Sequence, residues 1–162
     1  AEHFKSKSMR FGLNQMTLSD FADWLDQNPD IKIVTDIKGS NIDGLEAIKS
    51  ALQDQTDQII PQIYTRDEYA IVRSLGFEAI IFTAYRSSLD TSEILEFAQS
   101  HTLFAVTIPH SGINQDWQEW LNAMPVPVLA HTVNNKGQAA DLIEWGVSGF
   151  YTDYLIPAEP EL

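Results

Sequence analysis

Short runs of β-branched and aromatic residues alternate along the chain with longer segments whose apolar residues recur at helical spacing. Six of these runs are nearly continuously apolar, which is typical of strands that are covered on both faces in a parallel sheet. The pattern therefore predicts six parallel strands, at residues 31–37, 59–64, 79–85, 103–108, 126–133 and 149–155.

Each predicted strand follows an amphipathic segment that has one apolar stripe, as a helix covering a sheet requires. Thr17 and Thr91 stand where side-chain caps begin helices, and Gly76 and Gly146 stand where helices end before strands. The sequence thus predicts a helix before every strand.

A strand that recurs about every 20 to 28 residues, always with a helix between, indicates right-handed βαβ units. Such units build either an open doubly wound sheet or a (β/α)8 barrel. No glycine-rich phosphate loop follows any strand, which favours the barrel over the nucleotide-binding sheet. A complete barrel needs about 250 residues, whereas this chain has 162. We therefore expect an α/β fold, an incomplete TIM (β/α)8 barrel that lacks its first two strand–helix units.

The predicted domain organisation is simple. Residues 17–157 form the partial barrel, residues 1–16 an irregular N-terminal segment, and residues 158–162 a short tail. No internal linker divides the chain.

Composition excludes several classes of function. The chain has 10 Lys and Arg against 23 Asp and Glu, a formal charge of −13, so we expect no nucleic-acid partner. With no cysteine it has no disulfide, thiolate metal site or cysteine nucleophile. No apolar run is long enough to span a membrane, so a soluble protein is expected, either cytoplasmic or extracytoplasmic. The acidic excess is compatible with a carboxylate-bound cation, although a solvated acidic surface explains it more simply.

Candidate chemistry lies at the carboxyl ends of the predicted strands, where barrel enzymes build their sites. Asp36 and Lys38 end the first strand two residues apart, hence on one face. A carboxylate that binds Mg²⁺ or Ca²⁺ beside a lysine that binds phosphate would suit an anionic substrate. A structural ion pair explains the same two residues equally well.

Other strand ends carry polar side chains that could bind a ligand. Gln62 and Tyr64 end the second strand, and Tyr85 and Arg86 end the third. Each could hydrogen-bond a polar ligand, but a tyrosine at a strand end is more often a core residue with its hydroxyl in water.

Two histidines follow later strands. His110 and His131 both lie where a chain leaves a strand, and each is more often a structural residue than a base or ligand at such a place. The sequence contains no Gly-x-Ser-x-Gly elbow, no His-Glu-x-x-His motif and no nucleophile with an evident base. We therefore assign no catalytic residue.

Three segments together resemble a known family. They are residues 35–38 (TDIK), 130–135 (AHTVNN) and 146–153 (GVSGFYTD). Their order and spacing are similar to the C-terminal two-thirds of the glycerophosphodiester phosphodiesterases and their relatives among phosphatidylinositol-type phospholipases. The resemblance covers most of residues 17–156.

This resemblance implies a TIM-barrel hydrolase that cleaves a small glycerol phosphodiester into an alcohol and glycerol phosphate, with a divalent cation and two acid–base histidines. Asp36 falls where the family has its third metal-binding carboxylate, usually Glu, and Lys38 falls on the lysine that follows. His131 stands where many members have Trp. The resemblance thus implies Asp36 as a metal ligand. Together with the strand-end positions, it predicts Lys38, Gln62, Tyr85 and His131 as substrate-binding residues.

The chain departs from the family at its front. The His-Arg-Gly-like strand, the Glu-x-Asp metal pair and the His-Asp of the family do not occur before Asp36. We therefore expect a C-terminal part of a longer enzyme, inactive by itself, whose Mg²⁺ or Ca²⁺ site is incomplete. Two alternatives stay open: a non-catalytic partial barrel that binds phosphate or a cation, and another phosphate-handling barrel enzyme. The open sheet edges of six strands also predict self-association.

Overall fold

The structure is a computed structural model that describes residues 2–156. The segment before the barrel contains one helical turn, α1 (Glu2–Lys5), and a short 3₁₀ turn, η1 (Arg10–Gly12). The tail expected at residues 158–162, and residue 157 at the end of the expected barrel, lie outside the described residues.

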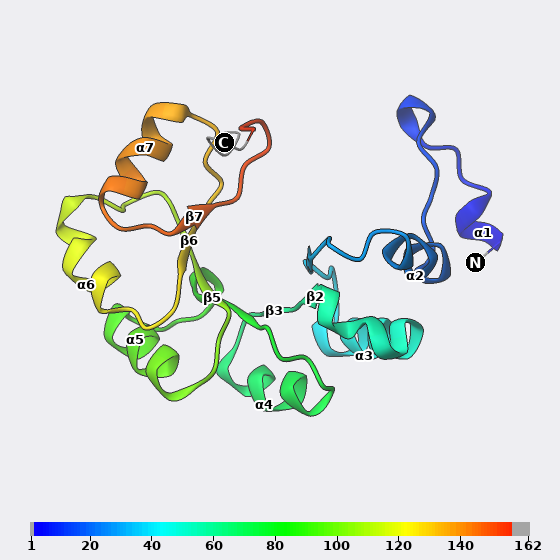
Figure 1. The fold of residues 1–162 in the computed structure, drawn as a ribbon, viewed down its shortest axis with the longest axis horizontal. Helices are drawn as coiled ribbons and strands as arrows, with labels where there is room; N and C mark the ends of the chain where they lie inside the picture. The colour runs from blue at the N-terminus through cyan, green and yellow to red at the C-terminus, as the bar shows by residue number, and fades with distance from the viewer. Residues whose placement is uncertain (1, 157–162) are drawn as a thin grey trace.

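All strands of the fold run parallel to their neighbours (Figure 1). They are β1 (Ile33–Val34), β2 (Ile59–Ile60), β3 (Gln62–Ile63), β4 (Ile81–Thr83), β5 (Ala105–Pro109), β6 (Val128–His131) and β7 (Gly149–Phe150). Each one falls on a run that the hydrophobic pattern predicts, although β5 extends one residue past its run, to Pro109. The predicted parallel α/β arrangement is confirmed.

Pro61 divides the second predicted strand into β2 and β3. β2 pairs with β1, while β3 pairs with β4. Proline has no N–H to donate to a ladder, but its carbonyl still accepts a hydrogen bond from the Ile81 N–H at 2.9 Å. The strand order is therefore β1, β2/β3, β4, β5, β6, β7, with β1 and β7 at the two edges.

Helices alternate with the strands and lie on the outer side of the curved sheet (Figure 1). They are α2 (Leu18–Asp26), α3 (Asn41–Leu52), α4 (Arg66–Ser74), α5 (Thr91–Ser100), α6 (Gln118–Ala123) and α7 (Lys136–Glu144), with 3₁₀ turns η2 (Gln53–Gln58), η3 (Ala84–Arg86) and η4 (Gln115–Trp117). Among residues 2–156, no helix is both long and apolar enough to cross a membrane.

Helix ends follow local chemistry. Thr17 caps α2 as predicted, because its hydroxyl accepts the Asp20 N–H while the Asp20 carboxylate accepts the Thr17 N–H. The predicted cap at Thr91 is wrong by one residue. The carboxylate of Asp90 accepts the first free N–H groups of α5, so Thr91 is already helical.

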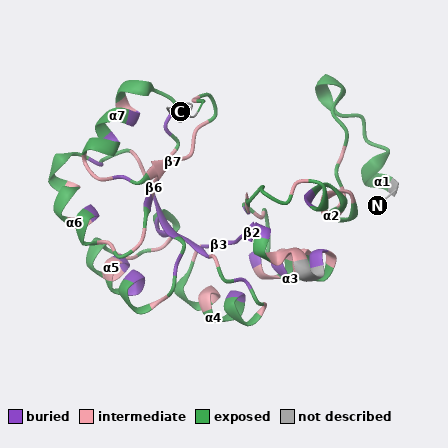
Figure 2. Ribbon diagram, in the orientation of Figure 1, coloured by how far each residue is buried: buried purple, intermediate pink, exposed green. Residues whose placement is uncertain are grey.

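The strands present two different faces. One face joins the helices in the main core, which includes Ile63, Phe82 and Val106 (Figure 2). The other face forms a small separate apolar cluster of Ile60, Ile81 and Ala105, against which Leu129 packs. Because no helix residue belongs to that second cluster, it is the concave, inner layer of the partial barrel.

Candidate functional site

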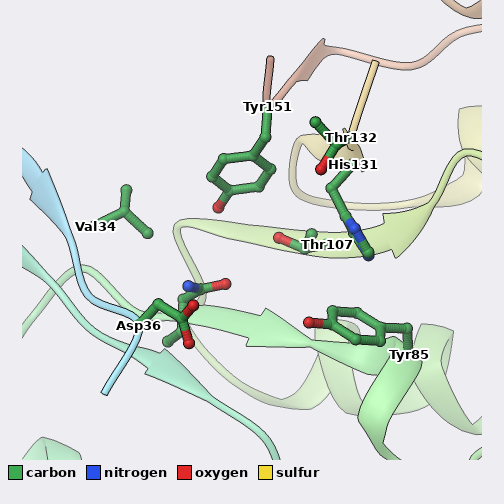
Figure 3. Close-up of a pocket in the computed structure, with 8 residues that line it drawn as sticks. Val34, Asp36, Tyr85, Thr107, His131, Thr132 and Tyr151 are labelled. Carbon is green, nitrogen blue, oxygen red and sulfur yellow. The ribbon is translucent and has the colours of Figure 1, made fainter. Parts of the chain in front are cut away.

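A pocket of about 500 Å³ lies at the carboxyl ends of the strands, the place where barrel folds build their sites. Figure 3 shows the side chains that line it. They are Val34, Asp36, Gln62, Tyr85, Thr107, His131, Thr132 and Tyr151. Val34 belongs to the edge strand β1, and Tyr151 directly follows the opposite edge strand β7. The six-strand arc is thus curved enough for both of its edges to line one pocket.

Strand geometry explains which residues reach the pocket. Side chains two residues apart share one face of a strand. Ile81, Ala105 and Leu129 belong to the inner apolar layer. Two residues further on stand Thr83, Thr107 and His131, so the inner face changes from apolar to polar toward the carboxyl ends. The apolar layer forms the base, and the polar residues above it face the mouth.

The charged side of the pocket consists of Asp36 and Lys38. The Lys38 Nζ lies 2.5 Å from the Asp36 Oδ2, and the Tyr64 hydroxyl donates to the Asp36 Oδ1 at 3.1 Å. The hydrogen bond from Lys38, followed by that from Tyr64, lowers the pKa of Asp36. Both members of the pair are largely exposed, with side-chain accessibilities of 53% for Asp36 and 76% for Lys38.

The pair is held by a loop and not by a strand. β1 ends at Val34, and after one more hydrogen bond, from the Thr35 N–H to the Ile60 carbonyl, the chain leaves the sheet. The strand expected to reach residue 37 is therefore shorter. Asp36 lines the pocket, whereas Lys38 does not line it and contacts Asp36 at its edge, through their ion pair.

Arg86 adds a second positive charge beside Asp36. Its guanidinium lies 4.9 Å from the centre of the Tyr64 ring and 5.8 Å from that of Tyr85, at cation–π distance. Burial, followed by the nearby Asp36 carboxylate, raises the pKa of Tyr64 to about 12. Tyr64 therefore stays a hydrogen-bond donor to Asp36 at neutral pH.

Gln62, expected to bind substrate, has both ends of its amide engaged within the protein. Its Nε2 donates to the Thr35 carbonyl at 2.6 Å, and its Oε1 accepts from the Thr83 hydroxyl at 2.9 Å. The side chain lines the pocket, but it ties the loop after β1 to β4. Its polar groups therefore serve the structure of the pocket wall.

The neutral side of the pocket consists of Thr107, His131 and Tyr151. Within residues 2–156, Thr107 Oγ1, His131 Nε2 and Tyr151 Oη are each buried and make no hydrogen bond of good geometry, although the Thr107 hydroxyl is near enough to Tyr151 to offset part of the effect of burial on the pKa of Tyr151. Thr107 is only 1% exposed. Buried polar atoms are nearly always paired, so three unpaired ones in one pocket require an explanation.

Burial keeps this side uncharged. It lowers the pKa of His131, with a smaller contribution from His110, and it raises the pKa of Tyr151. The His131 ring also packs against Tyr85, with centroids 4.3 Å apart. Near pH 7, His131 is therefore a neutral imidazole and Tyr151 a neutral phenol.

His110 does not line the pocket. The ring Nδ1 of His110 lies 3.0 Å from the His131 carbonyl oxygen, and the backbone N–H of His110 donates to the same oxygen at 2.9 Å. It therefore joins the ends of β5 and β6, which is the structural role that the sequence left open.

The described residues do not by themselves provide a site for a divalent cation. Among residues 2–156, Asp36 is the only carboxylate that lines the pocket, and both of its oxygens accept hydrogen bonds. No group of three or more His, Cys, Asp or Glu residues that could hold a metal occurs in this part of the chain. Mg²⁺ and Ca²⁺ bind through several oxygen ligands, which one carboxylate cannot supply.

Comparison with solved structures decides the fold. A glycerophosphodiester phosphodiesterase from Parabacteroides distasonis matches 94% of this chain with a TM-score of 0.69 and 13% identity. The chain therefore has part of the fold of a glycerophosphodiester phosphodiesterase. A putative glycerophosphoryl diester phosphodiesterase from Silicibacter pomeroyi matches the same share, with a TM-score of 0.69 and 12% identity. The chain spans 66% and 58% of these two phosphodiesterase chains.

A third solved structure is less similar, and the comparisons with family models and curated proteins found no match. An EAL enzyme, in a form bound to cAMP and cyclic-di-GMP, matches 82% of this chain with a TM-score of 0.56 and 17% identity, and the match covers 43% of that enzyme. No protein-family model and no curated protein matches the sequence.

Four residues of the pocket lining are absent from the predicted site, and two of them, Thr107 and Tyr151, carry hydroxyl groups that reach it from strand ends. The strand period could have found them, because each stands two residues after a small or apolar residue of the inner layer, Ala105 and Gly149. Their isolation from hydrogen-bond partners could not be found this way, since it depends on how neighbouring strands pack.

Proposed function

We propose that this chain is the C-terminal part of a metal-dependent glycerophosphodiester phosphodiesterase. The parent would hydrolyse a small-molecule glycerol phosphodiester to an alcohol and glycerol phosphate. One observation carries the proposal. The match to two phosphodiesterase structures covers 94% of this chain but only 58% to 66% of those chains, and the pocket lies at the carboxyl ends of the strands.

The proposed substrate site uses both sides of the pocket. Lys38 and Arg86 would attract the phosphoryl group, because they are the cations grouped around Asp36. Tyr85 and His131 would line the path of the ester, and Gln62 would hold the wall in place. This arrangement orients a phosphodiester but does not cleave it.

The chain by itself should be inactive. General acid and base catalysis requires titratable groups placed against the reacting atoms and contributes about 10² to 10⁴ each. Within the described residues, His131 and Asp36 are the titratable groups of the pocket nearest to such a role, and Asp36 is held ionised by Lys38. The partners of Asp36 within the described residues, Lys38 and Tyr64, hold it as a carboxylate and do not make it an acid–base pair with His131.

A cation, Mg²⁺ or Ca²⁺, belongs to the proposed complete enzyme. Asp36 would be one of its ligands, and residues outside this chain would have to supply the others. The cation would polarise the phosphoryl oxygens when bound.

The test is an assay of glycerophosphodiester hydrolysis with Mg²⁺ or Ca²⁺. The isolated chain should show no turnover above background, while a longer protein that includes the residues encoded upstream should hydrolyse the substrate. Enzyme-like turnover by the isolated chain would refute its inactivity. Upstream sequence without His-Arg-Gly-like and Glu-x-Asp segments would refute the parent enzyme and favour a non-catalytic binding module.

We also propose that the chain self-associates through its sheet edges. β1 and β7 are the edge strands, and Val34 of β1 and the nearby Ile31 are exposed hydrophobic residues at one edge. Unpaired edges attract further strands. Light scattering should show a concentration-dependent oligomer, and a clean monomer at all concentrations would contradict this.

A further inference from the structure

The N-terminal arm, residues 3–16, lies outside the barrel. Figure 1 shows it beside α2 and directed away from the strands β3 to β7. No residue from 3 to 18 is buried (Figure 2). An ion pair ties the arm to α2, with the Lys5 Nζ 3.0 Å from the Asp20 Oδ2. The arm is therefore a surface of its own, separate from the mouth pocket, to whose lining it contributes no residue.

Large apolar side chains gather on this arm and on α2. The exposed ones are Phe4, Met9, Phe11, Leu13, Met16, Leu18 and Trp24. At about 150 to 250 Å² for a fully open large side chain, these residues together expose roughly 600 to 950 Å². A soluble monomer rarely exposes an apolar patch above about 600 Å², and a standard interface buries about 800 Å² per partner. The exposed apolar area is thus enough for one side of a stable dimer.

The arm is basic, although the protein as a whole is acidic. Residues 1–16 contain three of the 10 Lys and Arg of the chain and one of its 23 Asp and Glu. Their net charge is +2, so residues 17–162 carry −15 to give the total of −13. Within residues 2–156, the side chains of Lys7 and Arg10 make no hydrogen bond or ion pair. These two cations are available to an acidic partner.

The helix α2 has the complementary character. It carries Asp20, Asp23 and Asp26 and no lysine or arginine. Asp23 is exposed, and in the part of the chain that the structure describes its carboxylate has no ion-pair partner. Leu18 and Trp24 are exposed on the same helix. Acidic and apolar side chains thus occur together on α2, as basic and apolar side chains do on the arm.

These two halves make the N-terminal face, residues 3–24, complementary to itself. Within one copy the arm does not cover this face, because the apolar side chains of both the arm and α2 stay exposed. A two-fold axis brings the arm of each copy against α2 of the other, so that every contact is made twice. Opposite charges then meet at short range, while repulsion between the acidic barrels is screened beyond about 8 Å at physiological ionic strength.

We propose that the N-terminal face is the interface of a symmetric dimer, in which the arm of each copy packs on α2 of the other. Phe11, which is 95% exposed, is the apolar anchor of this interface. Lys7 and Arg10 contact the acidic side chains of α2, of which Asp23 is the free one. This interface is distinct from association through the sheet edges, and it does not depend on the proposed enzymatic activity.

Sedimentation velocity tests the apolar anchor. The isolated chain should show a reversible monomer–dimer equilibrium in the micromolar range. Phe11→Ser should raise the dissociation constant about thirtyfold or more, because it removes an aromatic anchor from both halves of the interface. Ile156→Ser is the matched control, since Ile156 is 88% exposed but lies at the other end of the described chain. The control should leave the dissociation constant unchanged.

Charge reversals test the placement of the arm on α2. Arg10→Glu and Asp23→Lys should each raise the dissociation constant about fivefold or more, because each places like charges across the interface. Lys136→Glu and Glu119→Lys are the controls, because they make the same changes of net charge at exposed positions of α7 and α6. The double variant Arg10→Glu with Asp23→Lys restores opposite charges and should dimerise more tightly than either single variant. A double variant no tighter than the single ones would overturn this placement.

Other outcomes overturn the interface itself. A monomer at all concentrations would show that the N-terminal face does not bind a second copy. Loss of the dimer in Val34→Lys but not in Phe11→Ser would place the interface at the sheet edge. Cosedimentation of a monomeric chain with phosphatidylcholine vesicles that contain phosphatidylserine, lost in Phe11→Ser, would assign the arm to a lipid surface.

A longer protein that includes the residues encoded upstream should also dimerise and should lose the dimer in Phe11→Ser. A monomeric longer protein would show that preceding residues of the same chain cover the arm, and would overturn the inference. Circular dichroism checks that each variant is folded, which is expected because every substituted side chain on the arm and α2 is exposed. Hydrolysis tests the proposed function separately, so either conclusion can fail while the other stands.

Discussion

The two sides of the mouth pocket satisfy their polar groups in opposite ways. On the charged side, Asp36 and Lys38 are largely exposed, and every carboxylate oxygen has a partner. On the neutral side, Thr107 is buried and His131 and Tyr151 are half-buried, and within the described residues one buried polar atom of each makes no hydrogen bond of good geometry.

This difference separates interactions that hold the protein together from interactions that await a ligand. An exposed ion pair contributes little to the stability of the folded chain, because water screens both charges. A buried unpaired hydroxyl destabilises the folded chain until something binds it. The charged residues of the pocket thus already have partners, whereas its neutral residues keep polar atoms that a ligand can contact.

The largest effect should come from Gln62, which lies between the two sides and ties the loop after β1 to β4. Gln62→Leu should lower the free energy of unfolding by about 2 kcal/mol, because the Thr83 hydroxyl, 0% exposed, loses its acceptor. Urea denaturation measures this. Gln99→Leu, at an exposed position of α5, is the control and should stay within about 0.5 kcal/mol. An equally small effect of Gln62→Leu would contradict this structural role and make Gln62 a candidate for ligand binding.

His131 gives the neutral side a pH dependence. Its pKa is lowered from 6.5 in the folded chain, so below pH 6.5 the unfolded chain takes up a proton that the folded chain does not. The free energy of unfolding should therefore fall as pH falls from 6.5 to the folded pKa, by no more than about 1.4 kcal/mol per pH unit.

His131→Gln should remove that part of the slope in urea denaturation between pH 7.5 and 5. Gln99→Leu, a change at an exposed position of α5 that adds or removes no titratable group, should leave the slope as it is. An unchanged slope in the His131 variant would mean that the imidazole is charged when folded.

Thr107→Val should not lower the free energy of unfolding, in contrast to Gln62→Leu. Thr107→Val replaces an unpaired buried hydroxyl by a methyl group of the same shape, which is nearly neutral or stabilising by up to about 1 kcal/mol. Thermal unfolding of the unliganded chain measures this change. A loss of about 1 kcal/mol or more would reveal a hydrogen bond at Thr107 and remove the contrast between the two sides.

The smallest effect should come from the charged side. Lys38→Ala should change the free energy of unfolding by about 0.5 kcal/mol or less, because the ion pair with Asp36 is solvent-exposed. The same measurement in 1 M NaCl should reduce even this difference. A loss above about 1 kcal/mol would show that the pair holds the loop after β1 in place.

Much of the architecture could be predicted from residue order. All observed strands fall on the six predicted apolar runs, with β5 one residue longer than predicted, and Thr17 caps α2 as predicted. Strand ends were less predictable. β1 stops at Val34 although the predicted strand continues to Ile37, because only one further backbone hydrogen bond reaches β2.

The candidate site was predicted in part. Asp36, Gln62, Tyr85 and His131 do line one pocket, as expected for residues at neighbouring strand ends. Lys38 lies outside the lining, and the amide of Gln62 is engaged on both ends. A sequence places residues on a face, but it does not say which polar atoms find partners there.

The sequence by itself determined the parallel strands, the alternating helices and the edge at which polar residues gather, because periodicity and helix caps are local properties. Tertiary structure alone decided which of these polar residues are free. The isolation of Thr107, His131 and Tyr151 depends on the curvature that brings β5, β6 and β7 around one hollow. Curvature arises from packing between strands far apart in the chain, and no local pattern encodes it.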